Sequence, residues 1–172
     1  APVTIMLQGE GYHKDNAGHD ETVYAGDVQW MFAGKGLLHS EGPTDKILKE
    51  GGVQEFIQLW INVPASHKWD EPAYQSARQS SLPRVLVQQG ASFHLISGEY
   101  DGNTGPLKGF TPVILINGTI QAGNRVQFSA TPGYWTLIYI ISGSICINNE
   151  TIAAHNLIVF EKNNEEVIVH AK

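Results

Sequence analysis

His39 and Glu41 are the two residues of this chain whose types and spacing best suit metal chemistry. They follow Gly34 and Gly36, where the chain can turn back through positive φ. On a strand, side chains at i and i+2 point to the same face, so an imidazole and a carboxylate would converge there. If that face lines a barrel, the pair suits a divalent metal. On a solvated strand end the same pair would be ordinary surface residues, and the spacing alone favours this second interpretation.

The other residues that could do chemistry have simpler explanations. His19 is followed directly by Asp20 and Glu21, which indicates a solvated loop. The single cysteine, Cys146, excludes an intrachain disulfide and a zinc site built from cysteines. The sequence contains no Ser-His-Asp arrangement, phosphate-binding loop or glycine-rich dinucleotide fingerprint.

The composition indicates a globular protein and excludes several classes of partner. The 172 residues are 42% hydrophobic and 16% charged, which is too apolar for a disordered chain. The formal net charge is −6 and no basic cluster is present, so direct nucleic-acid binding is not expected. Apolar stretches such as Leu137–Ile141 are far shorter than the roughly 20 residues of a membrane span. The first residues show no signal-peptide pattern, so we expect a cytoplasmic protein.

Short runs of β-branched and aromatic residues alternate with glycine, proline and asparagine along the chain. This pattern predicts the strands of barrels or sandwiches, and no long window has a helical period. The clearest runs are Val3–Leu7, Phe56–Val63, Val113–Ile116, Thr136–Ile141 and Ser144–Ile147. The run Val113–Ile116 is expected to stop at Asn117-Gly118, and Ser144–Ile147 is expected to end in a turn at Asn148-Asn149. Two brief helices are predicted at Thr44–Glu50 and Glu71–Arg78. Trp30, Trp60 and Trp135 fall in predicted strands and are expected in the core.

The two halves of the chain also resemble each other, which suggests a duplicated β-barrel. Val3–Gly9 aligns with Leu137–Gly143, and each is followed by a strand, a polar turn and another strand. The polar segment between the halves predicts a linker. We therefore expect a first barrel over residues 1–65, a linker over 66–84 and a second barrel over 85–172.

The segment Gly26–Glu41, which reads GDVQWMFAGKGLLHSE, strongly resembles the pirin branch of the cupins. The resemblance continues through QLWINVPA at residues 58–65 and EPAYQ at residues 71–75. It implies an all-β bicupin of two cupin-type β-barrels, with one metal, usually iron, held in the first barrel by three His and one Glu. His39 and Glu41 match two of these ligands. His13 is plausible as a residue at the mouth of the barrel, but its family counterpart is not a ligand.

The resemblance places the other two ligands, an H-x-H pair, before Ala1, and the family's C-terminal segment after Lys172. We therefore expect the first barrel to be incomplete at its N-terminus and to hold iron or another divalent metal weakly, if at all. The second barrel is expected to hold no metal, because His170 and Lys172 stand at the corresponding positions. An incomplete barrel leaves an unpaired strand edge, which a homodimer would cover.

The resemblance implies two different functions. In the first, a metal-dependent dioxygenase opens quercetin with O₂, Glu41 serves as ligand and as the catalytic base, and the small aromatic substrate lies against Met6, Trp30 and Phe32. In the second, the protein is a binding or regulatory module with a protein partner and no turnover. A third possibility is a degenerate form that keeps only the scaffold. The two missing ligands favour the second and third possibilities for this chain.

Overall fold

The computed structural model describes residues 1–162 and 166–172, and these divide into two compact units. The first unit comprises Ala1–Pro83 and Leu95–Ile116, and the second comprises Arg84–His94 and Asn117–Lys172. The first unit contains β1 (Pro2–Gln8), β2 (Glu10–Asp15), β3 (Asp20–Tyr24), β4 (Val28–Phe32), β5 (His39–Pro43), α1 (Asp45–Glu50), β6 (Glu55–Trp60), η1 (Ala65–His67), β7 (Ala73–Ala77), η2 (Gln79–Ser81), β10 (Glu99–Tyr100) and β11 (Asn103–Thr104). The all-β expectation is confirmed.

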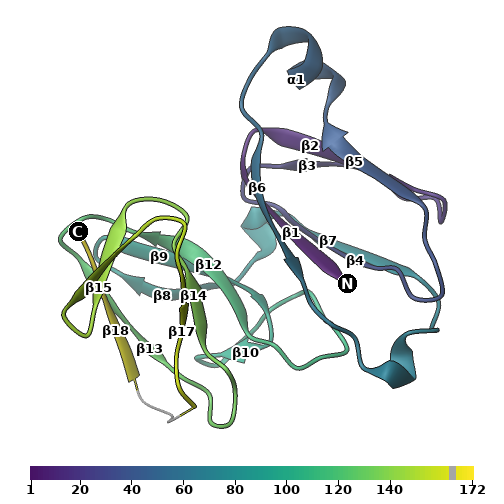
Figure 1. Cartoon of the computed structure of the whole chain (residues 1–172). Helices are drawn as coiled ribbons and strands as arrows, with labels where there is room; N and C mark the ends of the chain where they lie inside the picture. The colour runs from purple at the N-terminus through teal and green to yellow at the C-terminus, as the bar shows by residue number, and fades with distance from the viewer. Residues whose placement is uncertain (163–165) are drawn as a thin grey trace. The chain divides into compact units, whose positions relative to one another are not determined.

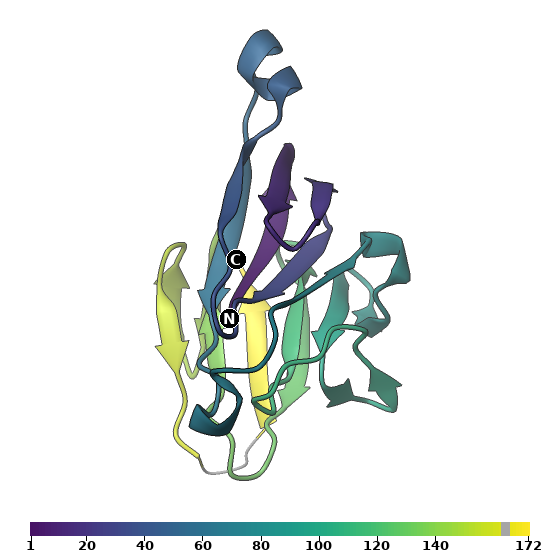
Figure 2. The same ribbon diagram turned by 90° about the vertical axis from the view of Figure 1, so that its right-hand side faces the viewer.

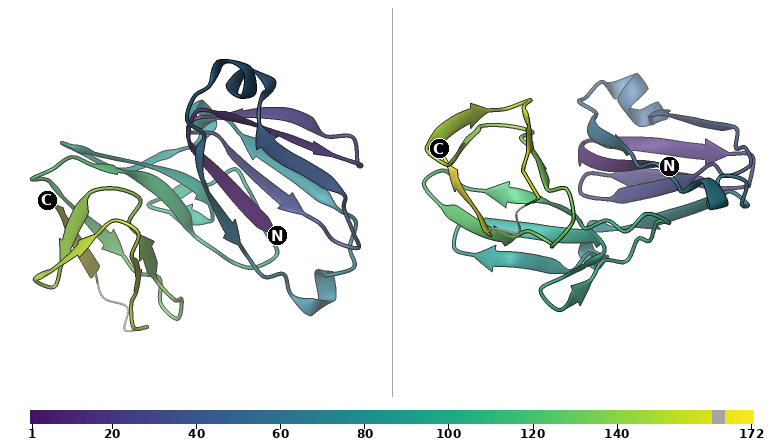
Figure 3. Two further views of the ribbon diagram at one scale, coloured as in Figure 1. Left: turned by 45° about the horizontal axis from the view of Figure 1, so that its top comes forward. Right: turned by 60° about the horizontal axis from the view of Figure 1, so that its bottom comes forward.

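Two antiparallel sheets form the layers of the first unit, and Figures 1 and 3 show them as separate layers. The first sheet has the order β6-β1-β4-β7, and the second has the order β3-β2-β5. Both sheets are open among the described residues, so the expected closed barrel is not seen there.

The register of the first sheet gives its two faces different characters. Val3 pairs with Trp30, and Thr4 pairs with both Gln29 and Gln58, so apolar side chains alternate with polar ones. The apolar face belongs to a buried cluster made of Val3, Ile5, Val28, Trp30, Ala77, Leu82, Ile96 and Leu107. The opposite face presents Thr4, Gln29 and Gln58.

The predicted helix at Thr44–Glu50 is confirmed as α1. The Thr44 hydroxyl accepts a hydrogen bond from the Ile47 amide, and Gly51 ends the helix with φ +78°. No residue of α1 is buried, and Figures 1 and 2 show it at one end of the first unit, clear of the sheets.

The prediction of a helix at Glu71–Arg78 is wrong, because Ala73–Ala77 forms strand β7. Its five residues pair with β4 in unbroken antiparallel register, from Val28 opposite Ala77 to Phe32 opposite Ala73. Part of the segment expected to be a linker, residues 66–84, is therefore a sheet strand. Pairing with β4 outweighs the weak local preference that suggested a helix.

The second unit consists of short antiparallel strands. Its sheets are β13-β18-β15-β16 and β14-β17, and a further sheet has the order β12-β9-β8, in which β9 is Ala91–Ser97 and β12 is Leu115–Ile120. The remaining strands are β8 (Arg84–Gln88), β13 (Arg125–Ser129), β14 (Leu137–Tyr139), β15 (Ser144–Ile147), β16 (Glu150–Ala153), β17 (Leu157–Val159) and β18 (Glu166–Ala171). Asn148 and Asn149, both with positive φ, make the predicted turn between β15 and β16.

Two tryptophans expected in the core lie at the surface. Trp30 is 2% exposed, as expected, but Trp60 is 79% and Trp135 is 63% exposed. Trp60 ends β6, which is an edge strand of its sheet. Within the described ranges, no helix is long and apolar enough to span a membrane.

Candidate functional site

Glu41 lies where both sheets of the first unit supply polar side chains. Its Oε1 accepts a hydrogen bond from Gln29 Nε2 at 2.6 Å, and its Oε2 accepts one from Gln58 Nε2 at 3.1 Å. His13 Nδ1 lies 3.2 Å from the same Oε1. Strands β2, β4 and β6 thus each contribute one partner, which fixes the direction in which the carboxylate points. The side chain is 24% exposed.

His13 is fully buried between two carboxylates. Its Nε2 lies 3.1 Å from Asp15 Oδ2, opposite the contact between Nδ1 and Glu41. Ionised carboxylates only accept hydrogen bonds, so bonding to both requires a proton on each ring nitrogen. The Tyr74 ring stacks on the imidazole with centroids 4.5 Å apart. This packing and the two polar contacts hold the ring in one orientation.

Asp15 binds the loop that follows it as well as His13. Its Oδ1 accepts hydrogen bonds from the backbone amides of Ala17 and His19, and its Oδ2 lies 2.8 Å from His19 Nδ1. Burial opposes ionisation, but the hydrogen bonds from His13 and His19 and the charge of His19 together hold the pKa of Asp15 well below 3.8. The carboxylate therefore stays ionised through the ordinary pH range.

Tyr74 connects the Glu41 site to β3. Its hydroxyl lies 3.0 Å from Glu21 Oε2 and 3.0 Å from Gln29 Oε1, while Gln29 donates through its other amide atom to Glu41. Burial, followed by the charge and hydrogen bond of Glu21 and the charge of Glu41, raises the pKa of Tyr74 above 10. Tyr74 is thus a neutral hydrogen-bonding group here, not a base.

His39 lies next to this network at the surface. Its ring stands 5.9 Å from the His13 ring, centroid to centroid, and the residue is exposed. Ser40, between His39 and Glu41, instead contacts the Tyr12 hydroxyl at 2.7 Å. His39 and Glu41 therefore both lie beside the His13 side chain.

The residues that the structure describes do not form a complete metal centre. Among the residues that the structure describes, no group of three His, Cys, Asp or Glu side chains is arranged to hold a common ion. His39 and Glu41 would supply only two ligands, whereas catalytic sites use at least three from the protein. Asp15 and His13 contact each other instead, so they do not add a third ligand to His39 and Glu41.

A cavity of about 280 Å³ opens beside Glu41. Further polar groups of its wall come from Thr4, Gln29 and Gln58, and apolar groups come from Met6 and Phe56. Met6 was expected to contact a substrate in this place, and it does line the cavity. Trp30 and Phe32 were also expected to contact a substrate, but they do not line this cavity. The pairing of Val3 with Trp30 puts both side chains on the other face of the sheet.

Sequence reasoning missed most of the residues around Glu41. His13 and Asp15 stand at i and i+2 on one strand, which is the same signal that singled out His39 and Glu41. Gln29 and Gln58 could not be found in that way, because only the register that puts both opposite Thr4 brings them together.

The comparisons with known proteins agree with this architecture. The family model described as Pirin matches residues 1–61, and the model described as Pirin C-terminal cupin domain matches residues 115–172. Pirin-1 of Arabidopsis thaliana is 36% identical over 92% of this chain and 54% of that protein. The crystal structure of quercetin 2,3-dioxygenase from Acinetobacter baumannii is 31% identical, with a TM-score of 0.92 over 99% of this chain and 60% of that one. The crystal structure of GK1651 from Geobacillus kaustophilus is 31% identical, with a TM-score of 0.87 over 99% and 68% of the two chains.

The fold is therefore of the cupin type, built from antiparallel strands with a cavity beside Glu41 in its first unit. The chain belongs to the pirin family, as the resemblance of Gly26–Glu41 implied. It spans about half the length of the curated relatives it matches, 54% in the case of Pirin-1.

Proposed function

We propose that this chain is a binding module of the pirin type in which His39 and Glu41 form a half-site for a divalent metal. The observation that supports this most directly is the Glu41 carboxylate, which faces a cavity and is oriented by partners on three strands. A ligand held in advance in its binding orientation loses little freedom on binding. With two protein ligands, the affinity is expected to be weak. Iron is the metal that the resemblance implies, and an imidazole with a carboxylate also suits other divalent ions.

The same cavity is proposed to bind a small hydroxylated aromatic molecule. Its apolar wall residues, such as Met6, Val23 and Phe56, suit a ring, and the carboxylate of Glu41 can accept a hydrogen bond from a hydroxyl group. Binding of this kind requires no turnover, which agrees with a regulatory role toward a protein partner. The homodimer expected from the sequence also stays a proposal, and the exposed Trp60 on edge strand β6 supports it.

A second candidate function is oxygenation of a flavonol such as quercetin. It is favoured by the likeness to a solved quercetin 2,3-dioxygenase, and Glu41 would be its base. This chain covers 60% of that enzyme and offers two of the ligands, so turnover would be an activity of a more complete site.

Calorimetric titration with Mn²⁺ or Ni²⁺ tests the half-site. The unmodified chain is expected to bind about one ion weakly, and His39→Ala should weaken this binding by about tenfold or more because it removes one of two ligands. His155→Ala, an exposed histidine of the second unit, is the matched control and should bind as the unmodified chain does. Equal affinity in the chain and in both variants would refute the half-site. Oxygen uptake with quercetin by this chain alone would favour the second candidate.

A further inference from the structure

We propose that the first unit carries a second ligand site, for a neutral aromatic molecule of one or two rings, on the face of the β6-β1-β4-β7 sheet opposite to Glu41. A cavity of about 220 Å³ lies there. Trp30 and Phe32 of β4 line it, whereas the neighbouring Gln29 lines the Glu41 cavity. Because side chains alternate along a strand, the sheet separates the two cavities. This site is independent of the metal half-site.

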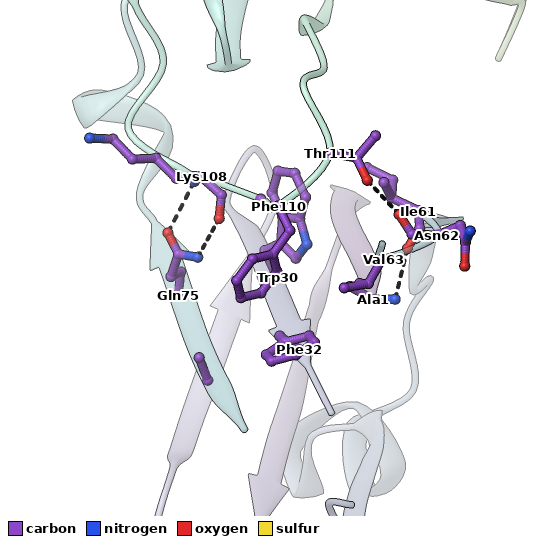
Figure 4. Close-up of a pocket in the computed structure, with 12 residues that line it drawn as sticks. Ala1, Trp30, Phe32, Ile61, Asn62, Val63, Gln75, Lys108, Phe110 and Thr111 are labelled. Carbon is purple, nitrogen blue, oxygen red and sulfur yellow. Dashed lines mark hydrogen bonds between the residues drawn. The ribbon is translucent and has the colours of Figure 1, made fainter. Parts of the chain in front are cut away.

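Aromatic and aliphatic groups make most of the wall, as Figure 4 shows. Trp30 is 2% exposed, and Phe32 and Val63 are each 7% exposed, so these side chains are fixed by packing. Phe110 packs against Phe32 with ring centroids 4.7 Å apart and a tilt of 58°. Tilted and offset ring pairs are the geometry that aromatic groups prefer, and a ring ligand could join the same stack.

The loop that closes the cavity, residues 108–111, is anchored at both ends. At one end the Gln75 side chain donates to the Lys108 carbonyl at 2.8 Å and accepts from the Lys108 amide at 3.1 Å. At the other end the Thr111 hydroxyl donates to the Asn62 carbonyl at 2.6 Å. Figure 4 shows both anchors on opposite sides of Phe110. The cavity therefore keeps its shape without a ligand.

Several polar groups on the wall already have partners within the protein. Gln75 uses both its amide nitrogen and its oxygen on Lys108, and the Ala1 nitrogen donates to the Ile61 carbonyl. Figure 4 shows the Lys108 side chain extending away from Trp30 and Phe110. Because the Lys108 ammonium is directed away and the Ala1 nitrogen is already bonded, an anionic or strongly polar ligand would lose its hydration with little compensation. The chemistry thus favours a neutral, apolar ligand.

The volume limits the size of that ligand. An apolar cavity of about 150 Å³ holds benzene. A cavity of about 220 Å³ is therefore suited to a single substituted ring or two fused rings.

Indole, with indole-3-carboxylate as its charged counterpart, tests the site in ¹H–¹⁵N spectra recorded with EDTA present. Indole is expected to bind saturably, with a Kd of about 1 mM or lower. The shifts should concentrate on the Trp30 indole NH and the amides of residues 108–111, and the anion should bind at least tenfold more weakly.

Ala73→Leu fills the cavity from β7 and should weaken indole binding at least tenfold, whereas Ser76→Leu, on the same strand but outside the cavity, should not. Phe110→Ala removes one wall of the cavity and should also weaken indole binding. This variant tests the site if Ala73→Leu does not give the spectrum of a folded protein. Unchanged binding in these cavity variants, shifts centred on Glu41 and Gln58, or no saturation would overturn the proposal. Because EDTA removes metal, failure here leaves the half-site untouched.

Discussion

Replacing His13 with alanine is expected to lower the free energy of unfolding of the first unit by about 3–5 kcal/mol. The imidazole is fully buried, and its two nitrogens face Asp15 and Glu41. Its removal leaves two carboxylates without their shared donor and leaves a cavity beside the Tyr74 ring. Urea unfolding, followed by hydrogen exchange of the β2 and β4 amides, measures the loss in this unit.

His39→Ala is the matched control for that measurement. His39 lies on the neighbouring strand, close to His13, but its side chain is exposed. Its replacement should change stability by no more than about 0.5 kcal/mol. Equal losses in the two variants would show that His13 is not the centre of a buried charge network.

Asp15→Asn is expected to lower the free energy of unfolding by about 2–3 kcal/mol at pH 7. It should also make the free energy of unfolding depend less steeply on pH in the acid range, here called the acid limb. The pKa of Asp15 in the folded chain is below its unfolded value of about 3.9. A lowered folded pKa gives stability that is complete above the unfolded pKa and is lost as pH falls toward the folded one. The unmodified chain should therefore lose stability below about pH 5 more steeply than the variant.

Asp20→Asn provides the control within the same hairpin. Asp20 pairs with Lys14 at 2.8 Å, but both side chains are well exposed. A surface pair of this kind contributes little, so the variant should follow the unmodified chain within about 0.5 kcal/mol at every pH. Thermal unfolding between pH 2 and pH 7 gives both curves, and parallel acid limbs for Asp15→Asn and the unmodified chain would contradict the assignment.

Local sequence signals were enough for much of the secondary structure. Strands β1 and β15, the Asn148-Asn149 turn and helix α1 each have a run or a cap that physical rules identify directly. The predicted stop at Asn117-Gly118 failed, because β12 continues through both residues. A Cβ at Gly118 would lie 2.4 Å from the Ser92 carbonyl oxygen, so this glycine permits close packing rather than ending a strand.

The candidate site was predictable only in part, for a different reason. Spacing on one strand identified His39 and Glu41, but the groups that orient Glu41 come from three other segments of the chain. Gln29 and Gln58 lie 12 and 17 residues from Glu41 in the sequence, and they meet at its carboxylate because β4 and β6 both pair with β1. The same pairing decides that Trp30 faces away from Glu41, which no local pattern reveals. To predict the site, one would need to know which strands pair and in which register, and residue types alone do not give this.

The location of a bound paramagnetic ion tests the half-site most directly. Substoichiometric Mn²⁺ broadens amide signals near the ion, and ¹H–¹⁵N spectra report each residue separately. We expect the strongest broadening at His39–Gly42 and His13, and its loss in Glu41→Gln, whose fold should be intact. Broadening centred on the exposed acidic residues of α1, or broadening at β5 that persists in Glu41→Gln, would show that this carboxylate binds no metal.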